Sequence, residues 1–256
     1  MDIRAHNRTA WDEQVQQGNR WTLPVSPEEI HAARRGDWSL LLTPLIPVPR
    51  EWYPKDLSKS DVLCLASGGG QQGPILAAAG ARVTVLDNSP RQLAQDRLIA
   101  EREQLQIRLV EGDMIDLSIF PDDSFDLIFH PVSNCFSKEI LQVWRECQRV
   151  LRKGGALLAG FVSPINYIFD LPLMDLGKLE VKYSLPYSDV GSLSEPELKE
   201  YLQTGVPLEY SHTFNEQIGG QLQAGLLLAG FYEDRNPEME LSKYAPTFFA
   251  TRAIKP

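Results

Sequence analysis

A cluster of glycines directly after a short apolar run is the feature that most constrains how this 256-residue chain can fold. The run DVLCLAS (61–67) is typical of a buried strand, and GGGQQG (68–73) follows it with the pattern GxGxxG. The next segment, PILAAAGA, predicts a short helix that ends at Gly80. Glycines between a strand and a helix let the backbone approach a ligand, and the helix start offers free N–H groups. The sequence therefore predicts a nucleotide-type site at this turn.

Short apolar runs alternate with helical segments after the glycine cluster. Ser89 and Pro90 begin one helix as its N-cap and first residue, with Gln92 as a capping-box partner, and another helix is expected over 137–151. Such alternation favours an α/β fold, with a mostly parallel sheet and helices on both faces. The expected strands after the first are 82–87, 107–113, 125–130 and 156–161.

The first 57 residues do not share this alternation, and they predict an N-terminal helical cap or lid. Amphipathic helices are expected over Arg4–Gln17 and over Pro27–Arg35, where Ser26 is the N-cap. The proline-rich stretch 41–54 predicts an extended connector, because proline disfavours helix.

Residues 58–256 are expected to form one domain with an insertion after its fifth strand. The insertion, 163–210, is rich in prolines, contains a possible hairpin at 178–185, and is expected to roof the substrate side. Helical periodicity then returns over 214–229. The remaining apolar segments, which predict a closing pair of strands, are 231–235 and 247–254.

Two strand ends add groups suited to an adenosine ligand. Asp87 ends the second strand, where a carboxylate can accept hydrogen bonds from both ribose hydroxyls. Asp113 and Met114 end the third strand and offer a polar edge and an apolar plate for adenine. The alternatives are a plain turn that binds nothing and a Met114 that is simply part of the core.

A dinucleotide would also suit this loop, so an NAD(P)-dependent oxidoreductase is an alternative. Pro74 directly after Gly73 counts against it, because it favours turn chemistry over helix–strand packing at the third glycine.

Four sequence blocks together resemble the motifs of class I S-adenosylmethionine (SAM)-dependent methyltransferases, in the right order. VLCLASGGG (62–70) resembles the first motif, VTVLDNSPRQL the second, EGDMIDLSIFPDDSFDLIFH the third and fourth, and WRECQRVLRKGGALLAGF the fifth. The pattern is similar to the type 11 branch, which includes many small-molecule methyltransferases. The resemblance implies a Rossmann-like, seven-stranded sheet with an antiparallel last strand. It also implies methyl transfer from SAM to a small-molecule acceptor, with release of S-adenosylhomocysteine (SAH).

Two positions depart from the family pattern. Cys64 stands where an acidic residue is usual, and Ala66 stands where glycine is usual. We expect Ala66 to alter contacts to the methionine end of the cofactor without abolishing binding. The departures leave open a SAM- or SAH-binding protein without transferase activity.

The resemblance also implies roles for single residues. Gly68 and Gly70 would pass beneath the cofactor, Asp87 would hold the ribose, and Asp113 would accept the adenine amine with Met114 on the base. The full set expected to contact the cofactor is Asn7, Trp11, Ala66, Ser67, Gly68, Gly70, Gln72, Asp87, Asn88, Gly112, Asp113, Met114 and His130.

Two histidines are candidate catalytic residues. His130 ends the fourth strand, and His212 precedes the last expected helix; either can take a proton or orient an acceptor. The alternatives are a strand cap for His130 and a solvent position for His212. Asn7 and Trp11 share one face of the first helix, from which the indole can lie beside a sulfonium; the alternative is that Trp11 is ordinary core.

Composition narrows the partners. The net charge is −9 and no Lys/Arg-rich run offsets it, so a nucleic-acid substrate is not expected. No run approaches the roughly 18 apolar residues of a membrane span, and the first residues lack a signal-peptide core, so a cytoplasmic location is expected. The three cysteines and four histidines show no metal-binding spacing, so no metal is expected. The oligomeric state stays open.

Overall fold

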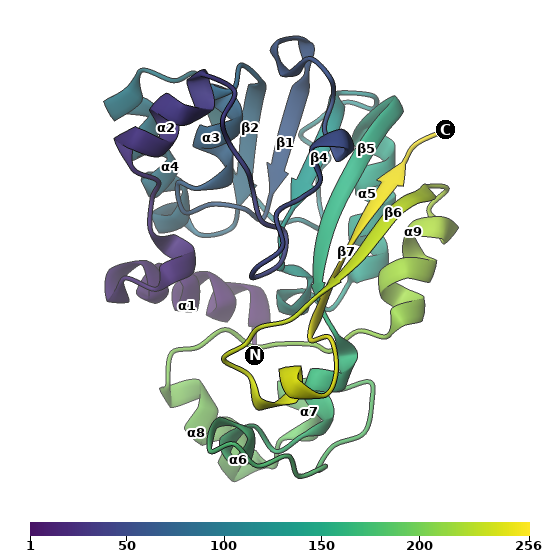
Figure 1. The fold of residues 1–256 in the computed structure, drawn as a ribbon. Helices are drawn as coiled ribbons and strands as arrows, with labels where there is room; N and C mark the ends of the chain where they lie inside the picture. The colour runs from purple at the N-terminus through teal and green to yellow at the C-terminus, as the bar shows by residue number, and fades with distance from the viewer.

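A seven-stranded sheet organises the computed structural model, which describes residues 1–256 (Figure 1). The strand order is β3-β2-β1-β4-β5-β7-β6, and β7 alone runs opposite to the other six strands. The Rossmann-like sheet with an antiparallel last strand is therefore confirmed. The strands are β1 (Asp61–Leu65), β2 (Arg82–Asp87), β3 (Ile107–Glu111), β4 (Phe125–His130), β5 (Leu151–Val162), β6 (Leu227–Asp234) and β7 (Phe248–Ile254).

Helices cover both faces of this sheet. Alternation along β1 sends Val62 and Cys64 into a core shared with α2, α3 and α4, while Leu63 and Leu65 join a second core under α5. No helix has both the length and the apolarity that crossing a bilayer requires. The helices are α1 (Ile3–Gln17), α2 (Pro27–Arg34), α3 (Gln72–Ala78), α4 (Pro90–Glu103), α5 (Ile140–Val150), α6 (Leu171–Asp175), α7 (Asp189–Ser192), α8 (Glu195–Gln203) and α9 (Gly220–Gln223).

The expected N-terminal cap divides into two parts. Helix α1 lies at the end of the sheet where the parallel strands finish (Figure 1). Residues 40–57 instead pack on one face of the sheet, with Leu42 and Trp52 inside the core. The connector passes so close to β5 that a Cβ atom on Gly160 would collide with the carbonyl oxygen of Leu42. This stretch is therefore part of the main domain rather than of a lid.

The insertion after β5 carries α6, α7 and α8, which gather beyond the same end of the sheet as α1 (Figure 1). The hairpin predicted over 178–185 is wrong. The backbone N–H of Lys182 donates to the carbonyl of Ile168 (2.8 Å), and the backbone N–H of Asp170 donates to the carbonyl of Glu180 (2.9 Å). The segment therefore pairs with residues that precede it in the chain. It has no glycine or asparagine to form a tight hairpin turn of its own.

The last predicted helix is too long. A π-helical turn at Asn215–Gly219 leads into the short α9, and Gly225 ends it with a φ of 93°. Glycine adopts this left-handed backbone readily, so the chain turns there and β6 begins at Leu227.

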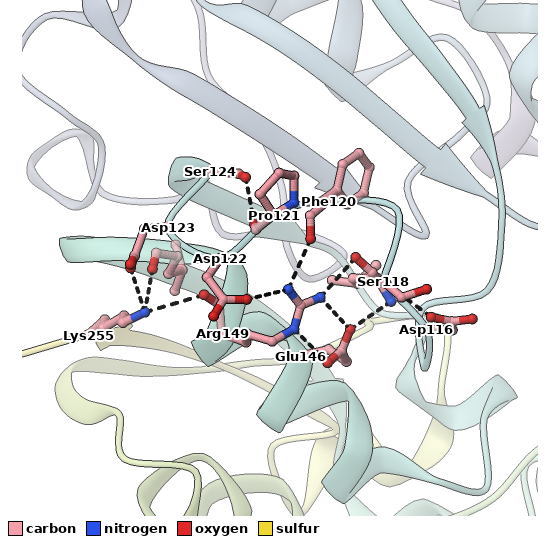
Figure 2. Close-up of polar contacts among 12 residues, drawn as sticks. Asp116, Ser118, Phe120, Pro121, Asp122, Asp123, Ser124, Glu146, Arg149 and Lys255 are labelled. Atoms are coloured by element: carbon pink, nitrogen blue, oxygen red, sulfur yellow. Dashed lines mark hydrogen bonds and ion pairs between the residues drawn. The ribbon is translucent and has the colours of Figure 1, made fainter.

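Arg149 of α5 fixes the irregular connection between β3 and β4 (Figure 2). Its guanidinium donates to the carbonyls of Leu117 (2.9 Å) and Phe120 (3.0 Å) and pairs with Glu146 and Asp122 (both 2.8 Å). A planar guanidinium can satisfy several acceptors at once. The cluster holds in place a loop that begins beside the expected adenine site.

Candidate active site

A cavity of about 1550 Å³ lies at the carboxyl ends of the parallel strands. Ala66 and Asp87 line the floor of the cavity, on the side of the sheet. Tyr187 and Glu209, both in the insertion, line its far wall. Ligands of open α/β sheets bind at this edge. The predicted cofactor residues that line the cavity are Asn7, Trp11, Ala66, Ser67, Gly68, Gln72, Asp87, Asn88, Gly112, Asp113 and Met114. Those that do not line it are Gly70 and His130.

The glycine loop closes tightly on the end of β2. Gly68 donates its N–H to Oδ2 of Asp87 (2.9 Å), and a Cβ atom on Gly68 would lie only 2.7 Å from Cβ of Gln92. Ser67 donates its hydroxyl to Oε1 of Gln72 (3.1 Å), which ties the loop to α3. The loop thus leaves backbone, rather than side chains, facing the cavity beside Asp87.

A buried carboxylate on α4 supports the loop from behind. Asp96 accepts the N–H groups of Gly69 (3.0 Å) and Gly70 (3.2 Å), and burial raises its pKa to about 8. Gly70 faces α4, where a Cβ atom would lie 3.0 Å from the carbonyl of Gln95. The expected contact of Gly70 with the cofactor is therefore corrected to a packing role. No motif in the sequence pointed to Asp96.

The interpretation of Gly73 also needs correction. Gly73 lies inside α3, and a Cβ atom there would be 2.7 Å from Cγ2 of Val85 on β2. Its role is close helix–strand packing, so the argument drawn from Pro74 was wrong.

The groups around Asp87 fit an adenosine ligand. Asp87 is partly exposed to the cavity, and its Oδ1 accepts the N–H of Ser89 (2.9 Å). Burial raises the pKa of Asp87. Each carboxylate oxygen has a further lone pair for a ribose hydroxyl. Gln92 lines the cavity beside Asp87 and does not form the predicted capping box. Its Oε1 is buried without a hydrogen-bond partner.

Helix α1 reaches the expected adenine end. Arg4 pairs with Oδ2 of Asp113 (3.2 Å), and Arg8 pairs with Glu111 (2.7 Å). Oδ1 of Asp113 accepts the N–H of Ile115 (3.1 Å). An adenine amine that approached Asp113 would therefore meet α1 as well as β3.

The two predicted α1 residues lie on the cavity wall. The Asn7 amide accepts the N–H of Leu208 (2.8 Å) and donates to the carbonyls of Leu208 (3.0 Å) and Phe136 (3.2 Å). Trp11 packs edge-on against the ring of Phe136, with centroids 5.2 Å apart. The polar atoms of Asn7 thus hold the segment around Leu208, which adjoins the far wall of the cavity.

Neither predicted catalytic histidine faces the cavity. His130 is buried, with Nδ1 2.8 Å from the carbonyl of Leu65 and Nε2 hydrogen-bonded to Asn134, and burial lowers its pKa. His212 is also buried, and its Nε2 donates to the carbonyl of Ser137 (2.7 Å). Both imidazoles satisfy buried backbone carbonyls. The assignment of either histidine as a base, and of His130 as a cofactor contact, is corrected on this geometry.

A carboxylate that the sequence did not single out faces the cavity instead. Oε2 of Glu209 accepts the hydroxyl of Tyr167 (2.6 Å), and its backbone N–H donates to Asp189 (2.6 Å). Burial raises the pKa of Glu209 to about 7, the Tyr167 hydrogen bond opposes this, and the charge of Asp189 adds to it. Only the folded insertion brings these residues together.

Comparisons with known proteins agree with this geometry. Residues 63–159 match the model of a family described as a methyltransferase domain. The chain is 49% identical to YbaJ of Bacillus subtilis, described as an uncharacterized methyltransferase, over 98% of both chains. It is 32% identical to the uncharacterized methyltransferase sll0829 of Synechocystis, over 63% of this chain and 72% of that one.

Solved structures share the fold. A SAM-dependent methyltransferase from Mesorhizobium loti superimposes with a TM-score of 0.61 at 18% identity, covering 80% of this chain and 94% of that one. The 49% identity to YbaJ over 98% of both chains, rather than the shared fold, makes the alternative of an NAD(P)-dependent oxidoreductase wrong. With its strand order, its glycine loop and a full-length relative at 49% identity, the chain belongs to the SAM-dependent methyltransferases.

Proposed function

We propose that this SAM-dependent methyltransferase methylates a small molecule held between the sheet edge and the insertion 163–210. The observation that carries the proposal is the size and continuity of the cavity, about 1550 Å³ from the glycine loop to Glu209. Pockets for one small ligand usually measure about 300–1,000 Å³. The cavity therefore has room for an acceptor beside the cofactor.

The residues on the sheet side are suited to hold the cofactor. Asp87 would accept the ribose hydroxyls, Asp113 the adenine amine, and Met114 would pack on the base, with the backbone at Gly68 beneath. SAM, when bound, supplies a methyl group on a cationic sulfur. The chain contributes proximity, alignment and exclusion of water.

Helix α1 is the element that we propose as the lid. Arg4 and Arg8 of α1 form ion pairs with Asp113 and Glu111. In addition, Oδ1 of Asp12 accepts the hydroxyl of Ser89 (2.6 Å) and the N–H of Arg91 (3.1 Å). The ion pairs and the contact with Arg91 lie at the surface, so they can break at low cost, whereas the hydrogen bond to the buried Ser89 is partly buried. The movable part would be α1 rather than all of residues 1–57, because 40–57 belong to the core.

The charge of the cavity supports a small acceptor over a nucleic acid. A polyanion needs lysines and arginines to neutralise its phosphates. Acidic groups predominate among the charged lining residues. The acids are Glu29, Asp37, Asp87, Asp113, Glu139, Asp175, Glu197, Glu200 and Glu209, and the bases are Arg4, Arg20, Lys138 and Lys182.

The test is to incubate the protein with SAM and separate fractions of a cell extract, and to measure SAH formation. We expect SAH to form with the low-molecular-mass fraction, and a product of that fraction to gain the mass of one methyl group. The Asp87→Ala variant, in which SAM binding is expected to be weaker, is the control for SAH that forms independently of this site. Turnover with only the nucleic-acid or protein fraction would contradict the proposal.

A further inference from the structure

Glu209 faces the cavity with a carboxylate that has no cation partner. Its Oε2 accepts the hydroxyl of Tyr167 (2.6 Å), whereas no donor of the protein reaches Oε1. None of the ion pairs of the chain includes it; the nearby Lys182 is held by Asp170 (2.8 Å) and Glu197 (3.0 Å). A carboxylate removed from water favours either a proton or a cationic partner.

A second carboxylate lies directly behind the first. The N–H of Glu209 donates to Oδ2 of Asp189 (2.6 Å), and the N–H of Asp189 donates to the carbonyl of Glu209 (3.1 Å). Tyr187 donates its hydroxyl to Oδ1 of Asp189 (2.7 Å). Two acids side by side favour a cation at this wall of the cavity, because a positive charge would stabilise the ionised form of both.

Aromatic rings surround the same end of the cavity. The rings of Tyr183 and Tyr187 lie 5.0 Å apart, and Tyr187 stacks on Tyr167 at 5.6 Å. Tyr201 and Tyr210 line the cavity beside them. The faces of tyrosine rings attract cations, most strongly where water is excluded. Carboxylates and tyrosines together are therefore matched to an ammonium group.

We propose that the methyl acceptor is a protonated amine, and that Glu209 binds its ammonium group and then takes its proton. This inference rests on the proposed small-molecule function and names the chemical class of the acceptor. Glu209 is the catalytic base, and Tyr167 is a positioning residue that holds one oxygen so that the other faces the amine.

The step balances in protons and electrons. The ammonium group gives one proton to the Glu209 carboxylate, which leaves a neutral amine and a carboxylic acid. The nitrogen lone pair forms the new N–C bond while the C–S bond of the sulfonium breaks, with its electron pair going to sulfur. The positive charge ends on the methylated nitrogen, and the carboxylic acid later returns its proton to water.

The surroundings of Glu209 match this role. Burial raises its pKa to about 7, which is close to the optimum for a general base at neutral pH. Burial also raises the pKa of Cys135 and of Tyr167, so both stay neutral, and it raises the pKa of Asp189 as well. The titratable groups that face Glu209 are Cys135, Tyr167, Asp189 and Tyr201.

The experiment measures binding by calorimetry to the SAH-loaded protein, using a panel of alkylamines and arylalkylamines, each paired with its alcohol isostere. We expect amines to bind the wild type roughly tenfold or more tightly than their alcohols. Glu209→Gln keeps an oxygen for Tyr167, removes the charge, and should abolish the preference. Glu195→Gln removes the charge of an exposed carboxylate of α8 that does not line the cavity, and it should retain the preference.

A carboxyl-selective ¹³C NMR titration gives a second measurement that needs no variant to bind ligand. We expect one glutamate resonance, absent from Glu209→Gln, to titrate near neutral pH and to move to lower pH when an amine binds. Alcohols that bind as tightly as amines, or a preference that survives Glu209→Gln, would overturn the inference and leave the small-molecule function standing. If SAH binds but no panel member does, the inference of an amine acceptor fails, and the test with separate extract fractions decides the small-molecule function.

Discussion

The two ends of the cavity are built in different ways. At the cofactor end, the lining groups directly follow strands: Ala66 and Gly68 follow β1, Asp87 ends β2, and Asp113 follows β3. At the acceptor end they come from segments without strands, and Glu209 is the main example. One end is positioned by the sheet, and the other by contacts between distant segments.

The carboxylates at the two ends also differ in their partners. Asp87 and Asp96 each accept two backbone N–H groups, although Oδ1 of Asp96 is buried without a partner. Glu209 accepts one hydroxyl and faces an open space. The two ends therefore differ in how the protein supports their carboxylates: backbone N–H groups hold those beside the glycine loop, whereas Glu209 has no cationic partner.

The largest effect on activity is expected for Glu209→Gln. The kcat/KM for an amine acceptor should fall about 100-fold or more, the usual cost of losing an acid–base group. SAH affinity should stay unchanged, because Glu209 lies at the other end. Steady-state kinetics and calorimetry on the same preparation measure both.

The pH profile supplies the control. Because only the carboxylate can accept the proton, wild-type kcat/KM should rise with pH through about 7, the pKa of Glu209. Glu209→Gln should lack this limb. A limb that persists in the variant would assign the base to another group.

The next effect concerns Asp87→Ala at the cofactor end. Loss of hydrogen bonds to a charged group should weaken SAH binding by about 1.5–3 kcal/mol, or roughly 10–100-fold. Calorimetry measures the affinity, and circular dichroism checks that the variant is folded. An unchanged affinity in folded protein would remove Asp87 from the site.

A smaller effect is expected for Asn7→Ala, which tests whether α1 joins the two ends. The change removes hydrogen bonds to Leu208 and Phe136, each worth about 1 kcal/mol. Hydrogen exchange of residues 1–20 should be slowed by SAH in the wild type and faster in the variant. Thr9→Ala, on the exposed side of α1, should behave like wild type. Equal exchange with and without SAH would make α1 a fixed part of the structure.

The smallest effect concerns Ala66, which has a φ of 46° at the end of β1. Ala66→Gly should raise the free energy of unfolding by up to about 1 kcal/mol, because glycine adopts this conformation without strain. Ala77→Gly, within α3, should lower it by about 1 kcal/mol. Urea unfolding measures both, and a destabilised Ala66→Gly variant would show that the alanine methyl group packs favourably.

Local signals explain what could be predicted from sequence. Strand ends and the N-caps at Ser26 and Ser89 depend on neighbouring residues, so they were recognised. The pairing of Asp96 with the glycine loop and of Glu209 with Tyr167 depends on the finished fold. His130 and His212 have suitable chemistry, yet a sequence does not show which way a side chain points.

The hydrogen bonds between Asn7 and Leu208 have a consequence for attempts to transfer acceptor specificity from one enzyme to another. Leu208 adjoins Glu209, and both its backbone N–H and its carbonyl are bound by a side chain some two hundred residues away. The unit that we propose to select the acceptor is therefore discontinuous. A chimera that exchanges only 163–210 would receive the new cavity wall without the matching α1 residues that hold it in place. Residues 1–12 must therefore be exchanged together with 163–210.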